Sequence, residues 1–221
     1  MSADNTAAPR LNIDFYLDVI CPWCWIGLRN LRTALQELRR QQPELELRLT
    51  WHADTLLPHI PDEGVDFQAF YLARRGDSRH AVVARRAQIN AVAQSVGLQI
   101  DFDAIQIFPN SRLVCALINL AQTSLTPDGM FDLVESLFDA HFVQCRNIGQ
   151  PEVVQSLALA AGLPWDAAHL AAQPPGRRPP AGGVPHVKFN REQVLTGAVP
   201  AADLLQAMTQ AVAGAQPEAA H

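Results

Sequence analysis

The stretch that decides the fold covers residues 11–28 and reads LNIDFYLDVICPWCWIGL. Its first part, residues 11–19, alternates and is rich in Ile, Phe, Tyr and Val, which predicts a β-strand. CPWC follows at 21–24, and apolar side chains then recur at helical spacing over residues 23–41. The strictly alternating LELRLTW at 45–51 predicts a second strand. A helical crossover between two strands favours a parallel pair.

The remainder of the chain is a long helical block followed by a short return to strands. Gly97 and Gly162 stand where helix C-terminal caps belong. QPPGRRPPAGGVP at 173–185 fits no regular element and is interpreted as a connector, with a mobile segment beside a site as the alternative. The predicted helices are 65–75, 79–96, 111–123, 128–142, 151–161 and 201–213, and the predicted late strands are 186–189 and 192–195.

This order predicts a discontinuous α/β domain interrupted by helices. The expected parts are an α/β domain of 11–60 plus 183–213, a helical insertion of 65–163, a Pro-rich connector of 173–183, and flexible tails at 1–10 and 214–221. With the helical block removed, one compact α/β domain remains.

Composition narrows the class of protein. The 221 residues are 48% hydrophobic and 18% charged, which excludes an intrinsically disordered chain. The net charge of −5 argues against nucleic acid as a partner. No apolar stretch is long enough to span a membrane, and the start MSADNTAAPR lacks the features of a secretion signal. The expected location is therefore the cytoplasm, where a CxxC pair is more often catalytic or metal-binding than structural.

The CPWC sequence carries the chemistry. Cys21 follows a strand and opens a helix, where unpaired backbone N–H groups and the helix dipole favour a thiolate. Cys24 lies one helical turn later and can close a small disulfide with it, while Pro22 suits the first helical turn. The pattern predicts thiol–disulfide exchange, in which Cys21 attacks and Cys24 resolves the mixed disulfide. Asp18 lies three residues before Cys21, so its charge would oppose thiolate formation if it points that way.

The cysteines also allow other roles. Half of a zinc site would need further ligands, and the seven histidines include no HxxxH pair, so no metal site is predicted. Two inert, buried cysteines at 21 and 24 are a second alternative. Cys115 lies within a helical pattern and is expected to be a core residue, whereas Cys145 is expected to be a spectator thiol near a helix end.

Val184 and Pro185 open the predicted strand HVKF. A proline at the start of a strand near a catalytic cysteine suggests a cis peptide bond, although an ordinary trans proline stays open on the residues alone. A cis turn would place the Val184 backbone across from Cys21, free to pair with an extended substrate.

The chain resembles the DsbA-like thioredoxin superfamily, and within it the FrnE-like branch of cytoplasmic disulfide oxidoreductases. The resemblance rests on DxxCPWCWIG at 18–27, PNSRLVCALINLA at 109–121, FDAHFVQCRNIG at 138–149, GVPxxxFN at 183–190 and TGAVPAADLLQAM at 196–208. It implies an α/β protein with a thioredoxin fold and an inserted all-helical domain.

The resemblance also implies roles for single residues. Cys21 is the nucleophile, Cys24 the resolving thiol and Pro185 the cis-proline, while the expected substrate-binding residues are Pro22, Trp23, Val184, Pro185 and His186. Two features depart from the family. His186 follows GVP where an apolar residue is usual, and PPGRRPP at 174–180 replaces a longer helix, so a more open groove is expected. The passive interpretation, in which His186 only packs, is favoured.

Three functions remain in view at the level of sequence. The first is a thiol–disulfide oxidoreductase or isomerase acting on protein or small-molecule disulfides and dithiols, with no bound cofactor and with glutathione or another thiol as co-substrate. The second is a glutathione-dependent isomerase or transferase of the 2-hydroxychromene-2-carboxylate isomerase or kappa type, which needs no second thiol. The third is a peptide-binding module. Only the first needs Cys24. The monomer and the homodimer are both compatible with the sequence.

Overall fold

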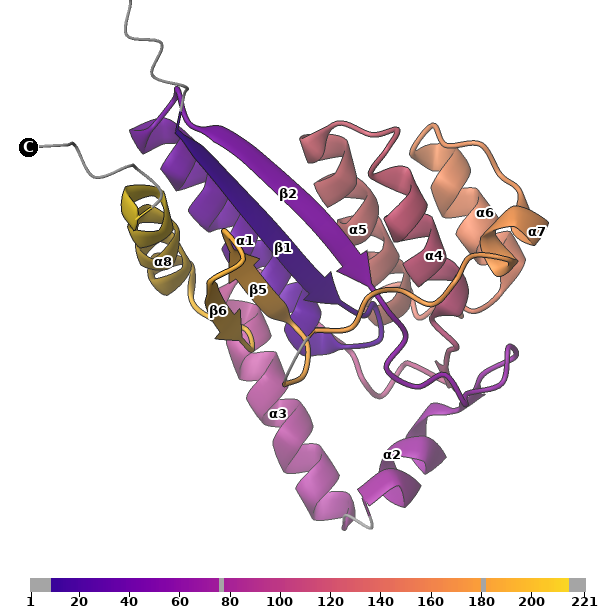
Figure 1. Cartoon of the computed structure of the whole chain (residues 1–221). Helices are drawn as coiled ribbons and strands as arrows, with labels where there is room; N and C mark the ends of the chain where they lie inside the picture. The colour runs from indigo at the N-terminus through magenta and orange to yellow at the C-terminus, as the bar shows by residue number, and fades with distance from the viewer. Residues whose placement is uncertain (1–8, 76–77, 180–181, 215–221) are drawn as a thin grey trace, which may run out of the picture.

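A computed structural model describes residues 9–75, 78–179 and 182–214 of the chain. Its main sheet has the strand order β2-β1-β5-β6, with β1 (Arg10–Leu17) parallel to β2 (Glu46–Ala53) as the helical crossover predicts. β5 (His186–Phe189) runs antiparallel to β1, and β6 (Gln193–Thr196) runs antiparallel to β5. Figure 1 shows the two long strands side by side with the two short ones beyond β1.

The helices form two groups around this sheet. α1 (Pro22–Gln41) and α8 (Ala201–Gly214) lie against each other on one face. The second group lies beyond the β2 edge and below the sheet in Figure 1. Its members are α2 (Phe67–Arg75), α3 (Arg79–Ser95), α4 (Arg112–Ala121), α5 (Pro127–Phe142), α6 (Pro151–Ala160) and α7 (Ala167–Ala171).

Local chemistry explains where α1 begins and which face of β1 is covered. Pro22 is the first residue of α1, a position at which a helix needs no N–H donor. Arg39 and Arg40 in its last turn stabilise the helix, because their positive charges interact favourably with the negative end of the helix dipole. In β1 the alternate side chains Leu11, Ile13, Phe15 and Leu17 are fully buried, which follows from the two-residue repeat of a strand.

The free edge of β2 is closed by two amide side chains, one from α4 and one from the residue that follows it. The Asn119 amide exchanges two hydrogen bonds with the backbone of Ala53, at 2.9 and 2.8 Å. The Gln122 amide does the same with the backbone of Trp51, at 3.1 Å each. These amides imitate a neighbouring strand and so protect an edge that would otherwise be open to pairing.

The insertion is also fastened to α1, the helix that carries the cysteines. Trp25 stacks on Phe138 of α5 and donates from its indole nitrogen to Glu135 at 2.8 Å. Arg29 pairs with the same carboxylate at 2.7 Å. The helical block therefore packs directly on the first turns of α1 and holds them in place.

Several expectations need correction. The insertion is not all-helical, because β3 (Val65–Asp66) and β4 (Ile107–Phe108) form a short antiparallel pair within it. Such short strands leave too little alternation to be detected. The predicted helix at 65–75 begins only at Phe67, and α7 was not predicted.

The predicted tails are shorter than expected, since Arg10 belongs to β1 and Gly214 to α8. Residues 1–8 and 215–221 lie outside the described residues. The division into independent domains stays a prediction. In the described part of the chain, no helix is both long and apolar enough to cross a membrane.

Candidate active site

Cys21 and Cys24 meet at the start of α1, as the spacing predicts. Cys21 is the half-buried residue that precedes the helix, and Cys24 is fully buried one turn later. The Cys24 backbone N–H donates to the Cys21 carbonyl at 2.9 Å, and the two thiols are hydrogen-bonded. One sulfur is therefore partly accessible while its partner is held behind it.

The two thiols are unequal. The hydrogen bond from Cys24 is the largest influence on Cys21 and lowers the pKa of its thiol, against the opposing effects of burial and of the Asp18 charge. Burial raises the pKa of the Cys24 thiol well above its ordinary value, and its interaction with Cys21 adds to this. Because the thiolate is the nucleophile, the geometry favours Cys21 as the attacking group and keeps Cys24 protonated behind it.

Asp18 is the polar centre beneath the pair and is 0% exposed. Its carboxylate accepts hydrogen bonds from the backbone N–H groups of Ile20 at 3.2 Å and Leu56 at 2.7 Å. Burial is the main cause that raises the pKa of this carboxyl to about 6, with the hydrogen bonds opposing it. Its charge raises the pKa of both Cys21 and Cys24, which agrees with the opposition expected from the sequence.

We expect Asp18→Asn to lower the pKa of the Cys21 thiol, because the variant removes a buried negative charge that opposes the thiolate. The rate of Cys21 alkylation should therefore begin to rise at a lower pH in the variant than in the wild type. The measurement is alkylation rate against pH.

Asp14→Asn is the matched control, since Asp14 lies in β1, which ends just before Asp18, but contacts His52 at 2.6 Å and is not among the causes of the Cys21 shift. An unshifted profile in Asp18→Asn, or the same shift in Asp14→Asn, would contradict this account.

Val184 and Pro185 lie opposite the thiol, as predicted. The peptide bond between them is cis, and the Cys21 thiol donates to the Val184 carbonyl at 3.8 Å. Gly27 of α1 permits this approach, because a Cβ at that position would lie 2.9 Å from the Pro185 ring. The glycine of the CPWCWIG sequence thus lets the proline pack directly on the helix that carries the cysteines.

The other predicted site residues lie nearby with different exposures. Trp23 is half-buried, whereas Pro22 is buried. His186 is 2% exposed, bonds to the Thr196 hydroxyl at 3.0 Å through Nδ1, and contacts the Tyr16 ring edge-on. This arrangement agrees with a packing role for His186. The contact of each of these side chains with a substrate stays a prediction.

The remaining cysteines lie outside the pair. Cys115 is buried, as expected of a core residue, and its thiol donates to Asp18 at 3.8 Å. Burial raises the pKa of that thiol well above its ordinary value, so it is a poor nucleophile. Cys145 is half-buried, and burial raises the pKa of its thiol too.

The Pro-rich segment does more than connect. Its described residues 173–179 run from the end of α7 across the ends of β2 and β1 (Figure 1). Gly176 allows the closest approach, since a Cβ there would lie 1.8 Å from the Ala53 carbonyl oxygen. Arg178 then pairs with Asp54 at 2.7 Å. Residues 176–178 therefore cover this side of the site.

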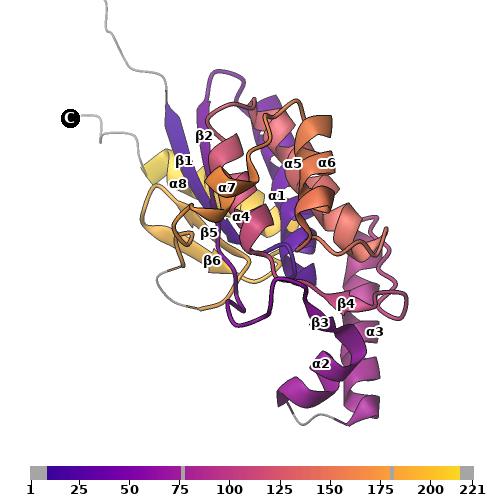
Figure 2. The same cartoon turned by 90° about the vertical axis from the view of Figure 1, so that its right-hand side faces the viewer.

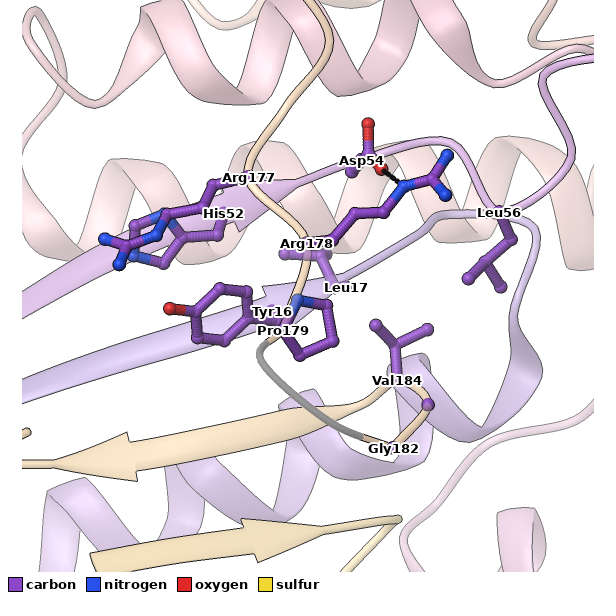
Figure 3. A pocket seen from close by; sticks show the side chains of 11 residues that line it. Tyr16, Leu17, His52, Asp54, Leu56, Arg177, Arg178, Pro179, Gly182 and Val184 are labelled. Atoms are coloured by element: carbon purple, nitrogen blue, oxygen red, sulfur yellow. Dashed lines mark hydrogen bonds and ion pairs between the residues drawn. The ribbon is translucent and has the colours of Figure 1, made fainter. Parts of the chain in front are cut away.

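Beneath this segment lies a pocket of about 210 Å³ that shares Val184 with the cysteine site (Figure 3). Sequence reasoning missed it. The Tyr16, His52 and Arg177 side chains gather at one end, and Leu56 and Val184 lie at the other. A signal was available, because polar side chains at the carboxyl ends of adjacent parallel strands often mark a site.

Residues 12–174 match the DsbA-like thioredoxin domain family. The chain belongs to this family. The thioredoxin fold with a helical insertion is thereby confirmed, and so is the superfamily resemblance. The family match ends before Val184 and Pro185, so the role of the late segment rests on the structure. No curated protein matches the chain significantly.

Solved structures extend the likeness over most of the chain. A probable DsbA oxidoreductase from Streptomyces coelicolor has a TM-score of 0.76 and 21% identity, covering 96% of this chain and 94% of that one. The cytosolic disulfide reductase DsbM from Pseudomonas aeruginosa, solved with GSH, has a TM-score of 0.52 and 19% identity over 92% and 96%. A 2-hydroxychromene-2-carboxylate isomerase has a TM-score of 0.54 and 15% identity over 90% and 95%. At these identities the likeness concerns the fold.

Proposed function

We propose that this protein is a thiol–disulfide oxidoreductase or isomerase of the FrnE-like branch, with Cys21 as nucleophile and Cys24 as resolving thiol. The observation that carries the proposal is the asymmetry of the pair. The Cys21 thiol is partly accessible with a lowered pKa, and the Cys24 thiol is buried with a strongly raised one.

The proposed reaction is an exchange of two bonds. The Cys21 thiolate attacks one sulfur of a substrate disulfide, which forms a mixed disulfide and releases the first substrate thiolate. Cys24 loses its proton and attacks the Cys21 sulfur, which closes the intramolecular disulfide and releases the second substrate thiolate. The substrate is thereby reduced and the dithiol oxidised. The reverse direction oxidises a dithiol, and the reduction potential decides which direction prevails.

Backbone geometry supports a place for an extended substrate. Val184 lies two residues before the strand β5, opposite Cys21, and the half-buried Trp23 flanks the accessible thiol. A substrate segment beside Val184 would present its disulfide to Cys21. We propose that Trp23, Val184 and Pro185 form this surface, with Pro22 and His186 supporting it from buried positions.

We further propose that the reaction needs no bound cofactor and that glutathione or another thiol closes the cycle. The neighbour DsbM is a cytosolic disulfide reductase solved with GSH, and a cytoplasmic role for this protein is compatible with that likeness. Protein and small-molecule disulfides both remain candidate substrates, and a homodimer stays a prediction.

The test is redox equilibration in glutathione buffers, followed by alkylation and intact-mass measurement. We expect Cys21 and Cys24 to convert together into an intramolecular disulfide, with Cys115 and Cys145 still reduced. The midpoint would then give the direction of the reaction. A pair that never closes, with only a glutathione adduct on Cys21, would overturn the proposal. That outcome would favour the glutathione-dependent isomerase or transferase, whose fold is also among the structural neighbours.

A further inference from the structure

The pocket beside the cysteine site has one apolar end and one polar end. Its apolar end is formed by Leu17, Leu56 and Val184, and Val184 is also the residue whose carbonyl accepts the hydrogen bond from the Cys21 thiol. Its polar end holds Tyr16 and Arg177 (Figure 3). A ligand that places a sulfur near Cys21 would therefore extend its other end toward the polar side chains.

The carboxylates in and beside this pocket already have partners. Asp54 pairs with Arg178 at 2.7 Å, and Asp14, near the polar end, is hydrogen-bonded to His52 at 2.6 Å. Arg177 is exposed, and among the described residues its guanidinium has neither an ion-pair partner nor a hydrogen-bond partner. A guanidinium without a side-chain partner at the wall of a pocket is suited to a carboxylate, which it binds through paired N–H donors.

Tyr16 adds a second polar group at the same end. Its ring stacks on His52 with centroids 4.4 Å apart and contacts His186 edge-on. These contacts hold the side chain in place, and it is only 2% exposed. Its hydroxyl makes no hydrogen bond within the described residues. Burial and the Asp14 charge raise the pKa of this hydroxyl, and the charge of the neighbouring Arg177 opposes them. An anion at this end could therefore accept a hydrogen bond from the fixed Tyr16 hydroxyl and pair with the guanidinium of Arg177, whose side chain is exposed.

The pocket size limits the ligand. Its volume of about 210 Å³ lies below the ~300–1,000 Å³ typical of sites for drug-sized molecules. One arm of a small disulfide fills such a space, whereas a folded protein could insert no more than a side chain.

We propose that the pocket beside Val184 selects small disulfides that carry a carboxylate, and that Arg177, with the Tyr16 hydroxyl, is the specificity determinant. This inference rests on the proposed exchange at Cys21. In that exchange one sulfur is attacked and the carboxylate-bearing arm lies in the pocket. The first thiolate leaves, and Cys24 then releases the second, so the disulfide yields two thiols as the enzyme pair is oxidised.

The test uses three disulfides with the same two-carbon arms and different end groups: dithiodipropionate (anionic), bis(hydroxyethyl) disulfide (neutral) and cystamine (cationic). The rate of oxidation of the reduced enzyme is measured with each and divided by the rate of the same disulfide with a simple neutral thiol. This division removes intrinsic reactivity. The wild type should prefer the anionic reagent over the neutral one, and the cationic reagent should be the slowest.

Arg177→Gln should reduce the anionic-to-neutral ratio by about three- to fivefold, the size expected for one exposed ion pair. The wild-type preference should also shrink as salt is added. Tyr16→Phe should lower the ratio in the same direction without changing the net charge.

Arg40→Gln is the matched control, because it removes the same charge from the last turn of α1, about 27 Å along the helix axis from Pro22. It should leave the ratio unchanged. If all three disulfides oxidise the pair but the wild type shows no anion preference, or if Arg177→Gln and Arg40→Gln behave alike, the inference fails while the proposed function stands. If none of the three reacts faster than with Cys21→Ser, the proposed function fails as well.

Discussion

Cys24→Ser is expected to lose catalysed disulfide exchange by about a thousandfold or more, because an oriented intramolecular thiol acts at an effective concentration far above that of millimolar free thiol. Cys21 keeps its place at the start of α1 and still attacks the substrate. The mixed disulfide then has no resolving partner. Intact-mass measurement should find one substrate half bound to each molecule, and turnover assays should find no release beyond that due to added thiol.

Cys145→Ser provides the comparison, since Cys145 is a half-buried thiol outside the pair. This variant should turn over at the wild-type rate. A Cys24→Ser protein that retains glutathione-dependent turnover would contradict the oxidoreductase mechanism. It would instead support an isomerase or transferase that uses a single thiol.

His141→Leu is expected to make the protein more resistant to acid. His141 of α5 is 0% exposed and packs between Phe67 and Phe142. Within the described residues, neither of its ring nitrogens has a hydrogen-bond partner. Burial lowers its pKa from 6.5 to about 3, and the nearby Arg146 backbone opposes this only in part. A protonated imidazole is therefore tolerated in the unfolded chain but not in the folded one.

The sign of the pH effect follows from linkage. The folded pKa lies below the unfolded one, so the stability that His141 contributes is present above about pH 6.5 and is lost as the pH falls toward 3. Between pH 7 and pH 4 the loss amounts to about 3 kcal/mol. Urea unfolding at both pH values should give a variant-minus-wild-type difference that grows by this amount on acidification.

The pH dependence of the free energy of unfolding must be compared between the variant and the wild type, because the Asp18 contribution changes with pH in the opposite direction to that of His141. The folded Asp18 pKa of about 6 lies above its ordinary value of 3.8, so its contribution is present below about pH 4 and lost as the pH rises through 6. The two effects partly cancel in the wild type. His80→Leu, at an exposed position of α3, is the control and should show no such growth. Equal pH dependence in His141→Leu and wild type would refute the assignment.

Much of the fold and the reacting pair could be predicted from local patterns. The alternation in β1 and the 3.6-residue spacing in α1 are properties of short segments, and CPWC between them places Cys21 at a helix start. The strand β3 and the helix α7 could not be predicted in this way. β3 has two residues and α7 has five, so neither spans the several periods that are needed to detect a strand or a helix from its pattern.

The sequence by itself determined where the two thiols lie on the helix, because two cysteines one helical turn apart at a helix start depend only on local spacing. Only the tertiary structure decided how exposed each thiol is and what surrounds the pair. Asp18 becomes a buried carboxyl between Leu56 and Cys115, and Arg177 reaches Tyr16 across a gap of more than 150 residues in the chain. Burial and charge pairing depend on which distant segments fold together, and no local period encodes them.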